Sequence, residues 1–177
     1  IENNIQNIVF CSTSAVYGIP KYLPIDEHHP LEPINFYGFT KLEIERLLHW
    51  YSELKGIKYA VLRYFNAAGY DSAARITGLE KNPQNLIPIV METANGARNT
   101  MQVFGDDYQT SDGTGIRDYI HVTDLATAHV KAMDYIMTND ENLTLNLATG
   151  AGYSVLDVIN KARGVTGEEI NYEVADR

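Results

Sequence analysis

The sequence predicts a doubly wound α/β fold built on a parallel sheet, and three consecutive patterns carry this prediction. A short, continuous apolar run at 7–12 has the composition of a strand that is buried on both faces. A helical pattern at 35–55 follows, and a second strand pattern occupies 57–64. Because a strand, a long helix and a strand in this order require a crossover connection, we expect the two strands to be parallel.

The helix expected at 35–55 is amphipathic. Its apolar residues recur at three- and four-residue spacing, and Gly56 follows as a stop signal. These apolar residues are Ile44, Leu47, Leu48, Tyr51 and Leu54. A loop rich in glycine, proline and charge, at 18–33, connects the first strand to this helix.

Beyond residue 69 the regular elements are separated by longer loops. A polar loop at 69–84 precedes a helix at 86–95 and a strand at 101–104, and a second long loop extends to residue 115. Loops of this length in a compact domain commonly carry function or are disordered. We therefore expect a smaller, substrate-binding α/β lobe in this part of the chain.

The last part of the chain returns to stronger patterns. The expected elements are a strand at 117–122, a helix at 123–137, a strand at 143–147 and a helix at 154–163. Thr123 or Asp124 is the expected N-cap of the first of these helices, and Ser154 that of the second. The chain starts without a methionine and ends just after a strand-like run at 170–174 that lacks a stop signal, so we expect both ends to be cut.

The composition excludes several classes of function. The formal net charge is -9, with 14 lysines and arginines against 23 acidic residues, which argues against a nucleic-acid surface. No apolar run approaches the roughly 18 residues of a membrane span, so no membrane association is expected. The single cysteine, Cys11, cannot form an internal disulfide, which favours the cytoplasm. No metal site is expected, because the histidines lack the spacing of metal ligands.

Tyr37 and Lys41 form the first candidate catalytic pair. Four residues separate them within a predicted helix, so their side chains project from the same face one turn apart. A lysine ammonium in this place favours the phenolate form of the tyrosine, which could then act as a base near neutral pH. Taken alone, the pattern is more typical of a solvated helix face, because pairs at this spacing arise by chance.

A cluster of hydroxyl side chains, Ser12, Thr13 and Ser14, ends the first predicted strand. The carboxyl ends of parallel strands are where α/β folds bind their ligands, so this cluster and the Tyr37–Lys41 helix could face one site. A hydroxyl donor, a tyrosine and a lysine together make a plausible centre for alcohol oxidation. The alternative is that the cluster only caps a turn or a helix.

A series of motifs extends over nearly the whole chain. They are F-C-S-T-S-A-V-Y-G (10–18), Y-G-F-T-K (37–41), L-R-Y-F-N-A-A-G (62–69), N-L-I-P (85–88), V-F-G-D-D-Y (103–108), D-G-T-G-I-R-D-Y-I-H-V-T-D-L (112–125), N-L-A-T-G (146–150) and S-V-L-D-V-I (154–159). In this order and spacing they resemble the carboxyl-terminal part of the UDP-glucose 4-epimerases, within the extended short-chain dehydrogenase/reductase family.

The resemblance implies a Rossmann-type sheet that is incomplete at its amino terminus, with residues 1–68 as the second half of the NAD-binding domain. Residues 69–177 would mainly form the nucleotide-sugar-binding lobe, and the segment 117–147 would partly return to the first domain. The implied activity is NAD-dependent epimerisation at C4 of a UDP-hexose through a 4-keto intermediate. A complete protein of this kind would be a homodimer, and the 177 residues alone would be inactive.

The resemblance also assigns roles to individual residues. Tyr37 would be the base, Thr13 would hydrogen-bond the sugar oxygen, and Lys41 would hold the nicotinamide ribose. Further contacts with the cofactor are implied for Ser12 and Tyr64. Contacts with the UDP-sugar are implied for Asn66, Asn85, Leu86, Val103, Phe104, Gly105, Arg117 and Tyr119. Without the resemblance, Arg117 could equally form an ion pair with Asp118 or Asp124.

Three alternatives remain open at this point. The glycine-rich turn that binds the pyrophosphate of NAD is absent from these residues, so the chain could be an inert piece. A member that binds a nucleotide without catalysis would be expected to lose Tyr37 or Lys41, and both are present. A related 4,6-dehydratase or UDP-glucuronate decarboxylase would share Tyr37 and Lys41. Such enzymes place an acidic residue just after the Ser/Thr, where this chain has Ser14 and Ala15.

Overall fold

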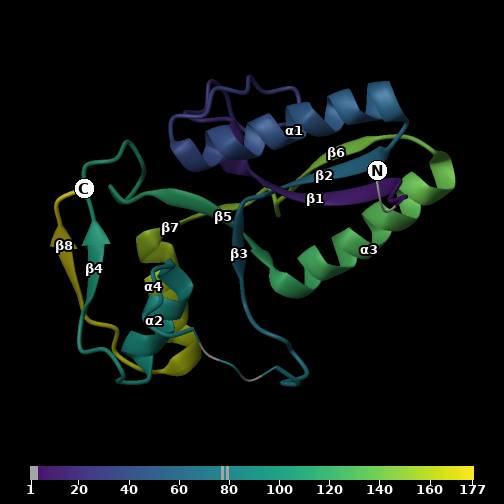
Figure 1. The fold of residues 1–177 in the computed structure, drawn as a ribbon. Coiled ribbons are helices and arrows are strands. Elements are labelled where there is room, and N and C mark those ends of the chain that lie inside the picture. The colour runs from purple at the N-terminus through teal and green to yellow at the C-terminus, as the bar shows by residue number, and fades with distance from the viewer. Residues whose placement is uncertain (1–3, 77, 79) are drawn as a thin grey trace. The chain divides into compact units, whose positions relative to one another are not determined.

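The computed structural model describes residues 4–76, 78 and 80–177, and it divides the chain into two compact units. The first unit consists of Ile1–Ala67 and Ile120–Gly150, and the second of Ala68–Tyr119 and Ala151–Arg177. The chain therefore passes from the first unit to the second, returns to the first, and ends in the second (Figure 1). Each unit has its own hydrophobic core.

The first unit is a parallel sheet with a helix on each face. Strands β1 (Asn7–Thr13), β2 (Lys58–Tyr64) and β6 (Leu143–Leu147) pair in the order β1-β2-β6, and both pairings are parallel. Helices α1 (Phe36–Lys55) and α3 (Val122–Asn139) lie on opposite faces of this sheet (Figure 1). The predicted crossover from β1 through α1 to β2 is confirmed.

The register of this sheet places two rows of residues side by side at its carboxyl edge. Ser12 pairs with Arg63, and Arg63 pairs with Asn146. One residue further along the strands, Thr13 pairs with Tyr64. Because side chains alternate between the two faces of a sheet, these consecutive rows point in opposite directions. The Ser12–Arg63–Asn146 row faces α1.

Helix α1 begins and ends where the sequence predicts. The Asn35 side chain accepts a hydrogen bond of 2.8 Å from the Gly38 amide, and Gly56 ends the helix in the left-handed conformation, with φ of 70°. Of the five apolar residues in the predicted stripe, only Leu48 is buried. The face that packs inward is instead formed by Gly38, Leu42, Glu45 and Leu48.

The predicted cap of α3 is wrong. His121, rather than Thr123 or Asp124, is the N-cap residue, because its ring nitrogen Nδ1 accepts a hydrogen bond of 3.2 Å from the Thr123 amide. The helix begins at Val122 and continues to Asn139. Neither α3 nor any other helix among the described residues has the length and apolar character needed to cross a membrane.

The second unit is built around α2 (Leu86–Ala94) and α4 (Val155–Thr166). Strand β4 (Met101–Phe104) pairs in parallel with β8 (Tyr172–Ala175). The buried core of this unit consists of Val90, Met101, Val103, Ile159 and Ile170. Ser154 caps α4 as predicted, with a full capping box that includes Asp157.

Two short strands and one short helix were not predicted. Strand β7 (Gly152–Ser154) pairs antiparallel with β5 (Ile116–His121), and strand β3 (Asn66–Ala68) follows shortly after β2. The 3-10 helix η1 (Ser14–Val16) directly follows β1. Elements of three residues are too short to show a period of two or of 3.6, so the sequence pattern cannot distinguish them from turns.

Candidate active site

Thr13 and Tyr64 are neighbours at the carboxyl ends of β1 and β2. The Thr13 Oγ1 accepts a hydrogen bond of 3.2 Å from the Ala15 amide, so this hydroxyl caps η1. The capping role that the sequence left open is therefore present. In this bond the Thr13 oxygen is the acceptor, so the hydroxyl proton of Thr13 can still donate to a ligand.

Tyr37 and Lys41 lie in the first two turns of α1. The Lys41 Nζ donates a hydrogen bond of 2.9 Å to the carbonyl oxygen of Cys11 on β1 and lies 5.7 Å from the centre of the Tyr37 ring. The Tyr37 side chain is 55% exposed, so a ligand can reach its hydroxyl. Strand β1 thus holds the ammonium beside the tyrosine, as the pair would require for proton transfer.

Gly38 allows α1 to approach the end of β1 closely. A Cβ atom at this position would lie 2.4 Å from the carbonyl oxygen of Ala15 and 3.1 Å from the Cβ of Pro33. Ala15 follows Thr13 by two residues in η1, and Gly38 follows Tyr37 directly. The absence of a side chain at Gly38 therefore permits the short separation between the two segments that carry the candidate catalytic hydroxyls.

Tyr64 is held by His129 of α3. The hydroxyl of Tyr64 hydrogen-bonds to the Nε2 of His129, while the Nδ1 of the same ring contacts the carbonyl oxygen of Leu125 at 2.7 Å. The carbonyl requires a proton on Nδ1, so Nε2 is the acceptor and Tyr64 the donor. Burial raises the pKa of Tyr64, and Cys11 contributes in the same direction. Tyr64 therefore remains protonated and donates to His129.

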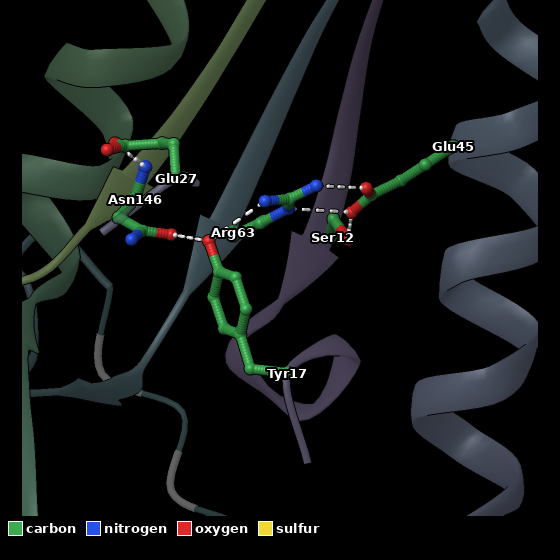
Figure 2. Close-up of polar contacts among 6 residues, drawn as sticks. All are labelled: Ser12, Tyr17, Glu27, Glu45, Arg63 and Asn146. Atoms are coloured by element: carbon green, nitrogen blue, oxygen red, sulfur yellow. Dashed lines mark hydrogen bonds and ion pairs between the residues drawn. The ribbon is translucent and has the colours of Figure 1, made fainter. Parts of the chain in front are cut away.

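The hydroxyl of Ser12 does not face the Tyr37 site. It donates to the carboxylate of Glu45 on α1, inside a buried network that the sequence patterns did not predict (Figure 2). Arg63 binds both oxygens of Glu45, with 3.2 Å from Nε to Oε1 and 2.7 Å from Nη2 to Oε2. Because the Ser12 hydroxyl is bound to Glu45, the predicted contact between Ser12 and a cofactor would have to use the Ser12 backbone.

The network continues across the sheet to β6. Arg63 Nη1 donates to the Tyr17 hydroxyl at 2.9 Å, and this hydroxyl donates to the Oδ1 of Asn146 at 2.6 Å (Figure 2). The backbone amide of Asn146 donates to Glu27 at 2.7 Å, which fixes the loop after η1. Two signals in the sequence could have indicated the network: an arginine inside the apolar run of β2, and a glutamate between Leu42 and Leu48 on the inward face of α1.

The second unit carries most of the residues implied in binding a UDP-sugar. Arg117 and Tyr119 alternate along β5 and therefore share a face. The Arg117 side chain is exposed, and its Nη1 donates to the carbonyl oxygen of Ile116 at 2.8 Å. Burial raises the pKa of the Tyr119 hydroxyl, against the opposing effect of the Arg117 charge. The role of both residues in phosphate binding stays a prediction.

The remaining implied contacts differ in their accessibility. Val103 is buried in the core of the second unit, so only its backbone could contact a nucleotide. Phe104, which is 60% exposed, and Gly105 follow it at the end of β4. Asn85 is exposed at the start of α2, whereas Leu86 packs against the core. Asn66 lies in the first unit, at the start of β3.

Comparisons with known proteins identify the family of this chain. The family model described as "NAD dependent epimerase/dehydratase family" matches residues 1–148. The UDP-glucose 4-epimerase of Halalkalibacterium halodurans is 49% identical over 100% of this chain and 53% of its own length. The corresponding enzyme of Lacticaseibacillus casei is 44% identical over 94% of this chain and 50% of its own length.

Solved structures show the same fold. A UDP-glucose 4-epimerase from Brucella ovis in complex with NAD is 43% identical, with a TM-score of 0.92, over 97% of this chain and 53% of the other. One from Bifidobacterium longum in complex with NAD+ and UDP is 41% identical, with a TM-score of 0.91, over 99% and 53%. These matches confirm the Rossmann-type α/β fold class, and the chain spans about half the length of the curated relatives it matches. The chain belongs to the NAD dependent epimerase/dehydratase family.

Proposed function

We propose that a complete protein containing these residues interconverts UDP-glucose and UDP-galactose by NAD-dependent epimerisation at C4. The observation that carries this proposal is the position of Tyr37 and Lys41 on the first turns of α1, where β1 holds the lysine ammonium beside the tyrosine and ends in Thr13. Relatives that are 44–49% identical to this chain are UDP-glucose 4-epimerases by name, which supports the same reaction here.

The donors at the edge of the first unit fit the nicotinamide and ribose end of NAD. The Lys41 ammonium has three protons, and its bond to Cys11 uses one of them, so the other two can reach ribose hydroxyls. Tyr37 adds a hydroxyl donor, Tyr64 adds an oxygen that can only accept because its proton is bound to His129, and Ser12 would contribute through its backbone. When bound, NAD would supply the acceptor and donor of hydride that oxidation and reduction at C4 require.

The residues of this chain would handle the proton and the orientation of the sugar. Tyr37 would take the proton from the C4 hydroxyl and later return it, while the Lys41 charge stabilises its phenolate. Thr13 would donate its free hydroxyl proton to the same sugar oxygen. In the second unit, Arg117 would bind the phosphates with its guanidinium fork, and Tyr119 would line the site beside it.

The nucleotide end of the substrate would contact a further set of residues. We propose contacts with Asn66, Asn85, Leu86, Phe104 and Gly105, and with the backbone of Val103. This set contains amide groups for hydrogen bonds and an exposed aromatic ring for stacking, which suits a pyrimidine nucleotide.

The product of the reaction tests this proposal and distinguishes it from elimination. In the complete protein supplied with NAD, UDP-glucose is expected to yield UDP-galactose of unchanged mass. A dehydratase would need an acid and a base to expel water, but Ala15 can neither donate nor accept a proton. The 177 residues alone, which lack a glycine-rich pyrophosphate turn, should give no product and serve as the negative control. A product lighter by one water, or by carbon dioxide from UDP-glucuronate, would contradict the proposal.

We also propose that the complete protein is a cytoplasmic homodimer. Leu47, Trp50 and Leu54 recur at helical spacing on α1 and are 54%, 60% and 72% exposed, and an apolar surface of this kind favours association with a second copy. Sedimentation of the complete protein should give the mass of a dimer. Leu54→Glu is expected to shift the equilibrium towards monomer, whereas Glu53→Gln on the same helix should not. A monomeric parent protein would contradict this prediction.

A further inference from the structure

The buried network of Ser12, Tyr17, Glu45, Arg63 and Asn146 lies next to the residues proposed for catalysis. The Ser12–Arg63–Asn146 row of the sheet is one residue before the row that contains Thr13 and Tyr64. Consecutive residues of a strand are rigidly linked, so a change in the position of Ser12 or Arg63 also moves its neighbour. The network and the candidate site therefore share two strands.

The network also shares a helix face with the candidate site. Glu45 follows Lys41 by four residues and Tyr37 by eight, so the three side chains lie along one face of α1. The carboxylate of Glu45 accepts from Ser12 of β1 and from Arg63 of β2 (Figure 2). One carboxylate thus joins the helix that carries Tyr37 to both strands that carry its proposed partners.

The geometry of the pair is strictly defined by its surroundings. The side chains of Glu45 and Arg63 are 8% and 6% exposed, and the guanidinium meets the carboxylate in a two-point fork. The third nitrogen of the guanidinium, Nη1, donates to the Tyr17 hydroxyl, and this hydroxyl donates to Asn146. A two-point contact restricts both distance and rotation, so sliding of α1 along the sheet would break it.

Stability alone does not account for such a pair. Burying two charges has a large desolvation cost, and well-packed apolar residues in the same space commonly give equal or greater stability. The pair borders a groove of about 440 Å³ between α1 and strands β2 and β6, whose lining includes Trp50 and Thr144. Glu45 and Arg63 therefore belong to the network and also line this groove. Tyr37 and Thr13 do not line it and lie instead at the carboxyl edge of the sheet.

We infer that Glu45 and Arg63 are positioning residues that fix the register of α1 on β1 and β2, and thereby the placement of Tyr37 and Lys41 relative to Thr13. This inference rests on the proposed function. The fork, rather than the charge alone, carries the effect, because a point contact would allow α1 to shift along the strands. Misplacement of a reacting group by about 1 Å can lower turnover about 100-fold.

Two variants of the complete protein test the inference. Arg63→Lys keeps the positive charge but removes the fork and the bond to Tyr17, and Glu45→Gln keeps the shape but leaves Arg63 without its countercharge. In both, kcat for UDP-glucose is expected to fall by about 10- to 100-fold with KM unchanged. Glu45→Gln should also melt at a lower temperature. Glu43→Gln is the matched control, because Glu43 forms an exposed ion pair with Arg46 on the same helix, and it should behave as the parent.

Hydrogen exchange separates loss of positioning from loss of overall stability. In both variants the amides at 36–42 of α1 should exchange faster, while those of α3 retain their protection at a temperature where the protein is folded. Equal acceleration in both helices, or unchanged exchange at 36–42, would overturn the inference. So would parental kcat in both folded variants. A parent without epimerase activity would contradict the proposed function instead, and the exchange data would still decide whether the pair positions α1.

Discussion

Tyr37→Phe in the complete protein is expected to lower the turnover of UDP-glucose by about two to four orders of magnitude, the range for loss of a general acid-base group. The substitution removes only the phenolic oxygen, while the ring beside the Lys41 ammonium remains. Because the Tyr37 side chain is 55% exposed, the stability of the fold should change little. Steady-state kinetics together with thermal unfolding would measure both effects.

A second tyrosine on the same helix provides the control. Tyr51 is 47% exposed, and Tyr51→Phe makes the same chemical change three to four turns further along α1. This variant should retain the turnover of the parent protein. If Tyr37→Phe retained it as well, Tyr37 could not be the base. Tyr64 would not be an obvious replacement, since its raised pKa and its hydrogen bond to His129 keep it protonated.

The parts of the fold that could be predicted are those with strong sequence patterns. The apolar strands β1 and β2 and the capped helix α1 each have a clear pattern, and their order required a parallel pairing. The strand predictions at 101–104 and 143–147 match β4 and β6. The same patterns placed Thr13 at the end of a strand and Tyr37 in a neighbouring helix, which was sufficient to predict that they share an edge of the sheet.

The stripe of apolar residues on α1 was a weaker guide. Helical periodicity shows that residues share a face, but it does not identify what that face contacts. Leu47, Tyr51 and Leu54 are exposed, whereas Gly38 and Glu45, which are not apolar, belong to the buried face. The helix packs inward where it can approach the strands closely, and this depends on the small volume of Gly38 and on a partner for Glu45.

The sequence contained hints of the buried charges, but their pairing could not be predicted from local sequence. Glu45 and Arg63 are 18 residues apart, and each alone is an ordinary charged residue within an apolar context. Their pairing depends on the crossover that brings α1 over β2, so it becomes visible only after the topology is known. The His121 cap of α3 is a simpler case, because histidine caps a helix only when its ring nitrogen accepts a bond, which composition does not reveal.

Gly38→Ala should destabilise the complete protein and reduce its turnover together. Inside a helix, alanine is favoured over glycine by about 1 kcal/mol, so propensity alone predicts a more stable protein. The added Cβ would lie 2.4 Å from the carbonyl oxygen of Ala15 and 2.9 Å from its carbon, and both atoms belong to the backbone. Overpacking of this kind costs about 1–3 kcal/mol, and the clash cannot be relieved by rotation of a side chain. We expect the clash to exceed the gain from propensity.

The same displacement would act on the candidate site, because α1 must move away from η1 to relieve the clash. That movement separates Tyr37 from Thr13, and turnover should fall by about 10- to 100-fold. Gly164→Ala is the matched control: Gly164 lies within α4, and a Cβ there would have no atom within 4 Å. The control should be more stable than the parent by about 0.5–1 kcal/mol in denaturant unfolding. The prediction would be contradicted if Gly38→Ala were as stabilising as the control and retained full turnover. Tyr37 and Thr13 would then function without the close approach of α1 to Ala15.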